Sequence, residues 1–344
     1  MMIHWETFQD SNELSLCCSG LTMNVESVAT SRTAMEIGIA SQTDRKPVLQ
    51  PALICPLCGS GRSEWELDAE MFGAGPYEHE LFSIYRCRAC EIGITDPVPS
   101  EANSRLLYED RTSLDFQAGD SSITTHFKNL AADQDVRKLI TGAQLRQPPR
   151  SVLDYACGNG AFAMSLRRAV AGAAVWATDY HSEAPPMLSG RDIRYCSYAD
   201  LPGHAPFDLV LCRHVLEHTY DPSDFLGRIR DLMSPGGVLL LEVPNLKAPL
   251  RRLFGKHWDG YYVPYHPVHF SAAALRHAAV KAGLIPEKAA GTEMPKIGRS
   301  LRNWIGCPYN AALFATGVLL HPLQFGAKFV TGEPTCLRLW ARKP

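Results

Sequence analysis

The stretch VLDYACGNGAF, residues 152–162, joins an apolar run to a turn built from small residues. The run ends at Asp154, and Ala156, Gly158 and Gly160 follow at every second position. The next segment, AFAMSLRRAV, has the apolar spacing of a helix. A buried strand that passes through a tight turn into a helix is where α/β proteins hold nucleotide-like ligands. The stretch therefore predicts a ligand-binding turn at the carboxyl end of a central strand.

Strands and helices continue to alternate after this stretch, a pattern typical of a parallel sheet covered by helices on both faces. Asp221 and Ser271 are the expected N-caps of two of the helices. We predict a doubly wound, mostly parallel, Rossmann-like α/β fold. The expected strands are SVLDYA, AAVWATDY, DIRYCSY, FDLVLCRHV and GGVLLLEVPN, followed by TCLRLWARKP, whose alternating pattern suits an antiparallel edge strand.

The composition of the 344-residue chain is that of a nearly neutral protein, with a formal net charge of −2 and an isoelectric point near 6.6. This balance argues against the basic surface that a nucleic-acid partner selects. The N-terminal residues lack the basic and apolar regions of a secretory signal. Eleven cysteines, four of them in two C-x-x-C pairs, favour metal binding in a reducing cytoplasm over a disulfide framework.

Changes in composition divide the chain into segments. Residues 1–50 lack periodicity and are expected to be a disordered extension. The cysteine pairs lie in residues 51–97, and residues 98–149 are expected to form a helical linker or cap that ends at RQPPR. Residues 150–344 carry the α/β domain, in which residues 295–332 are expected to be an apolar insertion or lid.

Two acids restrict the chemical class of ligand that the turn can bind. Asp154 would repel the pyrophosphate of a dinucleotide but attracts an ammonium group. Asp179, at the end of the next strand, is placed to accept hydrogen bonds from ribose hydroxyls. S-adenosylmethionine combines an ammonium group with a ribose and has no phosphate. A nicotinamide-dependent oxidoreductase would need a loop without Asp154, and a purely structural turn would leave both acids unexplained.

These motifs together resemble a known family. VLDYACGNG, ATDY, FDLVLCRHVLEHTYDP, LMSPGGVLLLEVPN and HPVHFSAAALRHAAVKAGL are similar to class I S-adenosylmethionine-dependent methyltransferases. The likeness is greatest to the small-molecule, methyltransferase-23-like branch, whose members often carry an N-terminal zinc ribbon. The resemblance implies a seven-stranded sheet and an enzyme that transfers a methyl group from S-adenosylmethionine to a small molecule.

The resemblance also assigns roles to residues of the turn. Asp154 matches the acid near the methionine amino group, and Asp179 matches the ribose-binding acid. Ala156 stands where the family usually has glycine, and a methyl group is tolerated there unless the turn needs a positive φ. The other expected cofactor contacts are Gly158 and Gly160, Tyr180 at the adenine edge, Ser197 where the family often has an acid, Tyr198 through its backbone N–H, and Cys212 and Arg213 beside the methyl group.

The pairs Cys55/Cys58 and Cys87/Cys90 have the spacing of two metal-binding turns. Four thiolates close a tetrahedral site with no open position, so we expect a structural zinc ion. The interval 59–86 has more acids than its two arginines, which disfavours nucleic-acid binding by this ribbon. We expect the ribbon to pack on the α/β domain and to wall off the substrate pocket.

Three histidines are candidates for a catalytic base. His214 follows the fourth expected strand, and His266 and His269 lie in VPYHPVHFS. Family members keep a histidine-rich segment of this kind at the pocket mouth, and some use such a residue as general base. For each candidate the alternative is a structural hydrogen bond. Glu217 and His218 follow His214. For these two residues we weigh a capping or packing role equally with a catalytic role.

Two further segments bear on the acceptor. The loop LKAPLRRLFGKHWDGYY carries Arg251, Arg252 and Lys256, which form either a solvated face or a clamp for an anionic acceptor, such as a nucleotide-linked sugar or lipid-linked glycan phosphate. Residues 309–329 are expected to be an apolar lid or an interfacial helix on a membrane. A zinc-ribbon binding protein with a non-catalytic methyltransferase-like domain is the remaining alternative.

Overall fold

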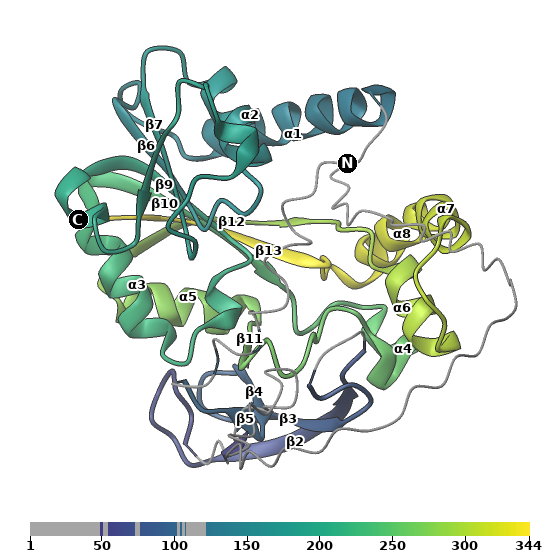
Figure 1. The fold of residues 1–344 in the computed structure, drawn as a ribbon. Helices are drawn as coiled ribbons and strands as arrows, with labels where there is room; N and C mark the ends of the chain where they lie inside the picture. The colour runs from purple at the N-terminus through teal and green to yellow at the C-terminus, as the bar shows by residue number, and fades with distance from the viewer. Residues whose placement is uncertain (1–48, 51–53, 73–75, 102–103, 105–106, 108–121) are drawn as a thin grey trace, which may run out of the picture.

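The computed structural model describes residues 49–50, 54–72, 76–101, 104, 107 and 122–344 (Figure 1). The expected extension over residues 1–50 lies outside the described residues, apart from a two-residue strand, β1 (Leu49–Gln50). The described residues form a seven-stranded sheet, a four-stranded sheet and a two-stranded sheet.

The central sheet has the strand order β12-β13-β10-β9-β6-β7-β8. The strands from β10 to β8 are parallel to their neighbours, whereas β13 is antiparallel to both β10 and β12. This topology confirms the predicted doubly wound, mostly parallel α/β fold. The strands are β6 (Ser151–Tyr155), β7 (Ala174–Asp179), β8 (Arg194–Ser197), β9 (Phe207–Arg213), β10 (Met233–Pro244), β12 (Ile285–Thr292) and β13 (Cys336–Arg342).

The predicted edge position of β13 is wrong. This strand lies between β10 and β12, and six of its seven residues are buried. The edge is β12, whose side chains are exposed or half-buried along its whole length. The alternation of apolar and polar residues in β13 had suggested that one face of the strand meets solvent. The polar residue Arg338 is instead buried in an ion pair with Glu242.

Helices cover both faces of the central sheet (Figure 1). On one face lie α1 (Ser122–Gly142) and α2 (Ala161–Ala169), and on the other lie α3 (Pro222–Asp231) and α5 (Ala272–Lys281). The expected N-caps are confirmed, since Asp221 accepts hydrogen bonds from two backbone N–H groups and Ser271 from one. Val136 and Leu139 of α1 pack in the core beside α2, so α1 belongs to the helical layer that covers this face of the sheet.

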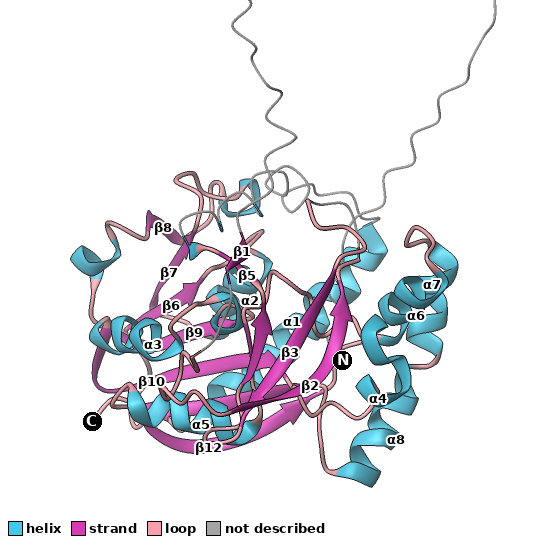
Figure 2. Ribbon diagram, turned by 90° about the horizontal axis from the view of Figure 1, so that it is seen from below, coloured by secondary structure: helices cyan, strands magenta, loops and turns pink. Residues whose placement is uncertain are grey.

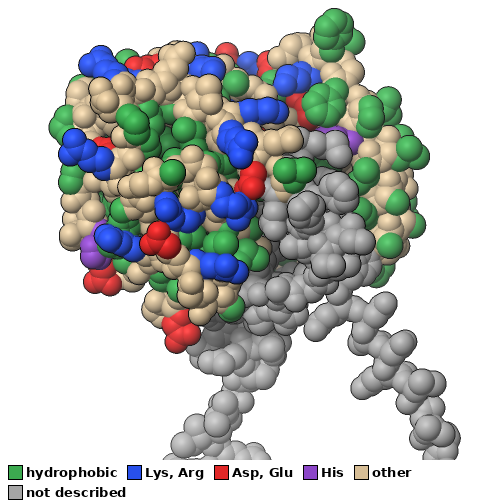
Figure 3. Space-filling model, turned by 90° about the horizontal axis from the view of Figure 1, so that it is seen from above, with side chains coloured by type: hydrophobic (Ala, Val, Ile, Leu, Met, Phe, Trp, Pro, Cys, Tyr) green, Lys and Arg blue, Asp and Glu red, His purple; other side chains and the backbone are tan. Residues whose placement is uncertain are grey.

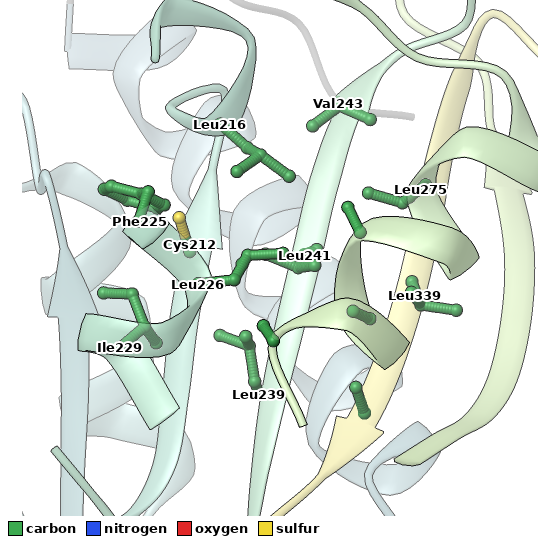
Figure 4. Packing of buried hydrophobic residues seen from close by; sticks show 14 of the residues in the cluster. Cys212, Leu216, Phe225, Leu226, Ile229, Leu239, Leu241, Val243, Leu275 and Leu339 are labelled. Atoms are coloured by element: carbon green, nitrogen blue, oxygen red, sulfur yellow. The ribbon is translucent and has the colours of Figure 1, made fainter. Parts of the chain in front are cut away.

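The core between the sheet and the helices α3 and α5 contains Cys212 (Figure 4). Its side chain is buried among Leu216, Phe225 and Leu226. The expectation that Cys212 lies beside the transferred methyl group is therefore corrected, because its thiol faces the apolar core. A cofactor contact through its backbone stays a prediction.

The cysteine-containing segment forms a sheet with a strand from the α/β domain. Its order is β11-β4-β3-β2, and β11 pairs antiparallel with β4. Gly93 of β4 lies opposite His269, and a Cβ at Gly93 would lie 2.9 Å from the His269 Cβ. The ribbon is thus joined to the α/β domain by backbone pairing. The strands are β2 (Ser63–Glu70), β3 (Leu81–Cys87), β4 (Gly93–Asp96) and β11 (Val268–His269), while β5 (Val98–Pro99) pairs with β1.

The insertion over residues 295–332 folds into three helices, which lie together with α4 on one side of the molecule (Figures 1 and 2). It leaves the central sheet where β10 ends, because Pro244, Cys336 and Thr292 are register partners. The helices are α4 (Arg251–Phe254), α6 (Ile297–Ile305), α7 (Ala311–Leu319) and α8 (His321–Thr331), and 3-10 turns span Pro186–Leu188, Leu201–His204, Leu216–His218 and Gly255–His257.

Candidate active site

The turn after β6 is held in a left-handed conformation. Ala156, Gly158 and Gly160 have φ values of 59°, 56° and 86°. A Cβ at Gly160 would lie 2.7 Å from the Leu188 side chain, whereas a Cβ at Gly158 would meet no atom within 4 Å. Gly158 therefore borders open space at the ligand edge. Ala156 does occupy the positive φ at which a methyl group is strained, at a cost of about 1 kcal/mol or more.

Asp154 presents an unsatisfied oxygen at this turn. The residue is 3% exposed, and its Oδ2 has no hydrogen-bond partner among the residues that the structure describes. Burial raises the pKa of this carboxyl to about 7, and Asp179 adds to the rise while Arg213 opposes it. A buried carboxylate oxygen without a partner fits the ammonium group that the sequence predicts here.

Asp179 fastens the turn to the end of β7. Its Oδ2 accepts a hydrogen bond from the Gly158 N–H at 2.7 Å, and its Oδ1 accepts one from the Tyr180 N–H at 2.7 Å. Each carboxylate oxygen has further lone pairs, so hydroxyl donors of a ribose can still bind. The structure brings the two acids and Gly158 together as the sequence predicted.

The residues expected around the adenine lie beside the next strand. Tyr180 is exposed, and Tyr198 stacks on Tyr155 with ring centroids 5.0 Å apart. The Ser197 hydroxyl donates a hydrogen bond to Asp200 Oδ2 at 2.7 Å. Sequence reasoning missed Asp200, which places a carboxylate three residues after the position where the family often has one. The sequence signal for Asp200 was the acid that ends the segment SYAD, residues 197–200.

A buried carboxylate on β10, that of Glu242, joins several elements. Its oxygens accept hydrogen bonds from Arg213 and His214 at 2.9 and 3.1 Å and from Arg338 at 2.5 Å. Arg338 on β13 also pairs with Asp135 on α1 at 2.9 Å. Burial raises the pKa of Glu242, but Arg213, His214 and Arg338 together hold it well below its usual range. Glu242 is therefore ionised inside the fold.

His214 is held between two carboxylates. Its Nδ1 lies 3.3 Å from Glu217 Oε1 and its Nε2 lies 3.1 Å from Glu242 Oε1. Burial lowers the pKa of the ring, but the hydrogen bonds to both carboxylates outweigh this effect and raise it. The two hydrogen bonds fix the orientation of the ring, so this arrangement supports a positioning role. The assignment of His214 as a base stays a prediction.

His266 and His269 are buried at the junction with the ribbon. Thr95 Oγ1 on β4 donates a hydrogen bond to the His266 carbonyl at 2.6 Å and lies 2.9 Å from His269 Nε2. Burial lowers the pKa of His269 to about 3 and that of His266 well below its usual range. Both rings are neutral near pH 7, and their role as bases stays a prediction. Sequence reasoning missed Thr95, since nothing links residues 95 and 269 along the chain.

A small cavity lies against these rings. Its volume is about 10 Å³, and it is lined by Glu217, His266 and His269 together with Asn245 and Trp258. A space of this size holds one water molecule or ion. An acceptor molecule can reach either ring only if the lining residues move.

The four cysteines predicted to bind a metal ion lie together. All four Sγ atoms are within 4.8 Å of one another, with 3.5 Å between Cys55 and Cys90 and 3.6 Å between Cys58 and Cys87. A tetrahedral zinc ion with bonds of about 2.3 Å separates its sulfur ligands by about 3.8 Å. The side chains therefore fit a closed four-thiolate site.

Two of the three cations expected to clamp an anionic acceptor pair with acids of the ribbon, and the clamp itself stays a prediction. Arg251 Nη2 lies 2.6 Å from Glu66 Oε1, and Lys256 Nζ lies 2.7 Å from Glu70 Oε2. Arg252 is exposed. The loop thus docks β2 on the α/β domain, and Arg251 and Lys256 already have anionic partners within the chain.

Comparison with known proteins agrees with this geometry. Residues 126–288 match the family model described as Methyltransferase domain. A probable S-adenosylmethionine-dependent methyltransferase from Mycolicibacterium smegmatis is 31% identical over 147 residues, which cover 41% of this chain and 54% of that protein. The ubiquinone biosynthesis O-methyltransferase of Azotobacter vinelandii is 32% identical over 151 residues, which cover 39% of this chain and 62% of that protein. Residues 126–288 therefore form a domain similar to the class I S-adenosylmethionine-dependent methyltransferases.

The matches leave much of each protein uncovered, since the chain spans roughly half of the length of the curated relatives that it matches. Among solved structures, a putative methyltransferase from Bacillus halodurans is 19% identical and has a TM-score of 0.41, covering 61% of this chain and 99% of that one. The plantazolicin methyltransferase BamL is 13% identical, with a TM-score of 0.43, covering 68% of this chain and 90% of that one.

Replacing Glu242 with glutamine should lower the free energy of unfolding by about 3–5 kcal/mol, because two arginines would lose a buried anionic partner. Urea denaturation monitored by circular dichroism measures the change. Glu287→Gln is the matched control, because Glu287 pairs with Arg342 at the edge of the same sheet. Its loss should cost at most about 1 kcal/mol. Equal losses in the two variants would contradict a central role for Glu242.

Binding of S-adenosylhomocysteine should strengthen about tenfold for each pH unit up to about pH 7 and then level off, because Asp154 must lose its proton to bind the ammonium group. Calorimetric titration across this range measures the slope. Asp154→Asn should bind more weakly and show no slope. A native protein with pH-independent affinity would exclude Asp154 as the ammonium ligand.

Proposed function

We propose that this protein transfers a methyl group from S-adenosylmethionine to a small-molecule acceptor. The observation that carries the proposal is the buried, unpartnered Asp154 oxygen beside Gly158 and Asp179 at the carboxyl edge of the sheet. The match of residues 126–288 to the family model supports it. In a dinucleotide-dependent oxidoreductase the Asp154 carboxylate would repel the pyrophosphate. In a binding protein without a cofactor the buried Asp154 oxygen would have no partner.

The chain's own part in the reaction is binding and alignment. Bound S-adenosylmethionine would supply an electrophilic methyl group. Asp154 would hold its ammonium group and Asp179 its ribose hydroxyls, while Tyr180, Ser197 and Tyr198 border the adenine. Fixing the acceptor in line with the methyl group removes most of the entropic barrier of a two-substrate reaction. A neutral histidine or a water molecule would take the proton of a hydroxyl acceptor.

We infer that the four cysteines hold a structural zinc ion. The spacing of their four sulfur atoms supports a closed four-thiolate site. Zinc binding would stabilise a short segment that has little apolar core of its own. None of the described cysteines forms a disulfide, which is consistent with the cytoplasmic location that we predict.

The surface supports an acceptor that is anchored in a lipid layer. Of the described residues, one helical stretch, Ala311–Thr331, is long and apolar enough to cross a membrane by length and composition alone, yet only 17% of its most apolar window is buried. Phe329 and Val330 are 93% and 82% exposed. Figure 3 shows hydrophobic side chains along the side of the molecule where α7 and α8 lie in Figure 1.

The charge of this region suits an anionic membrane surface. Residues 295–332 contain two lysines and two arginines and no acid. Helices with exposed apolar side chains and flanking cations lie at the boundary between headgroups and acyl chains. The region leaves the sheet at its carboxyl edge, so a membrane-bound molecule would be presented beside the cofactor site.

Asp179→Ala should weaken binding of S-adenosylmethionine at least tenfold and lower methyl transfer in proportion, because two ribose hydrogen bonds and an anchor of the turn are lost. Calorimetry with S-adenosylhomocysteine measures the change in binding. Incorporation of labelled methyl groups into lipid extracts and nucleotide sugars measures the change in methyl transfer. Asp231→Ala, which removes an exposed acid on α3, is the control. Tighter binding of a nicotinamide dinucleotide by the native protein would refute the proposed function.

The double variant Phe329→Ser, Val330→Ser should lose most of its co-sedimentation with phosphatidylglycerol vesicles, because the exposed apolar side chains would no longer enter the lipid layer. The native protein should bind phosphatidylcholine vesicles less well. Val280→Ser on α5 removes a valine that is 60% exposed on another helix and should bind like the native protein. Native protein that fails to sediment with either vesicle would remove the support for a lipid-anchored acceptor.

A further inference from the structure

A second group of metal-ligating side chains lies away from the four cysteines. Glu217, His218 and His266 each bring one ligand atom to within 4.8 Å of the other two. Glu217 is 1% exposed and His266 is 6% exposed. The sequence separates Glu217 and His218 from His266 by almost fifty residues, so only the fold brings them together.

Two atoms of this group are buried without a hydrogen-bond partner in the part of the chain that the structure describes. They are Glu217 Oε2 and His266 Nδ1. Leaving a buried polar atom unsatisfied costs about 1–3 kcal/mol, and more for a charged group. Both residues line the cavity of about 10 Å³. A ligand in the cavity that bound both the Glu217 carboxylate and the His266 imidazole nitrogen would satisfy these two atoms.

We propose that Glu217, His218 and His266 bind a divalent transition-metal ion. Two imidazole nitrogens and one carboxylate oxygen form a donor set that suits Zn²⁺ and its neighbours in the first transition series. The cavity has room for a single ion. Three protein ligands leave a coordination position open, in contrast to the closed cysteine site.

The surroundings orient the ligands. His218 Nδ1 lies 2.8 Å from the Tyr265 carbonyl, so this nitrogen donates the hydrogen bond and leaves the lone pair on Nε2. The His218 and His266 rings meet at a centroid distance of 4.6 Å. The backbone of His266 is held on both sides, because its N–H donates to the Tyr262 carbonyl and its carbonyl accepts from Thr95.

The position of the ion would matter for the acceptor. It would lie between β11 and the end of β9, next to His214, whose Nδ1 contacts Glu217 Oε1. A hydroxyl group that took the open coordination position would have a lowered pKa and would be a better nucleophile. This consequence rests on the proposed methyl transfer to an oxygen atom, whereas metal binding itself does not.

Cobalt substitution tests the proposal, because Co²⁺ bound to thiolates gives intense near-ultraviolet charge-transfer bands that a nitrogen and oxygen site lacks. Metal-depleted full-length protein loaded with Co²⁺ should bind two ions per chain. Glu217→Gln and His266→Ala should each bind one ion and keep the thiolate bands. Cys55→Ser with Cys87→Ser should lose the thiolate bands and keep the other ion. His277→Ala, an exposed histidine on α5, is the control and should bind two.

The competing occupant of the cavity is a water molecule. In that case native protein would bind one Co²⁺ ion with full thiolate bands, and this result would overturn the proposal. The titration is made without cofactor or acceptor, so its outcome is separate from that of the methyl-transfer assays. The native stoichiometry decides the question even if a histidine variant fails to fold, and circular dichroism of each variant detects such a failure.

Discussion

The ionised carboxylate of Glu242 is the interaction on which the architecture of the site depends. It is fully buried, and it binds Arg213 at the end of β9, His214 directly after it, and Arg338 on β13. Arg338 in turn binds Asp135 on α1. The cost of burying one anion is offset only because several cations converge on it. The same carboxylate therefore connects three strands and a helix and fixes the direction of the His214 ring.

The ribbon completes the site from the other side. Its strand β4 pairs with β11, and Thr95 on β4 contacts the histidine segment that β11 contains. The acids of β2 bind the basic loop that follows β10, through Arg251 and Glu66 among others. The ribbon is thus a structural part of the catalytic domain.

Much of the architecture follows from local sequence. The strand, turn and helix around Asp154, the acid at Asp179 and the caps at Asp221 and Ser271 depend on residues close together in the chain, and each was predicted. The position of β13 inside the sheet was not. An alternating pattern reports that one face is polar, but a polar side chain such as Arg338 can equally be buried against a carboxylate from a distant strand.

The sequence by itself therefore determined the α/β fold, the two acids of the cofactor turn and the set of four cysteines, because short-range spacing sets strand, turn and metal-knuckle geometry. Tertiary structure decided the rest. It placed Arg251 against Glu66, turned the Cys212 thiol into the core and brought Glu217, His218 and His266 together. These contacts join residues far apart in the chain, and whether a charge is paired or an imidazole is buried depends on which distant backbone packs beside it.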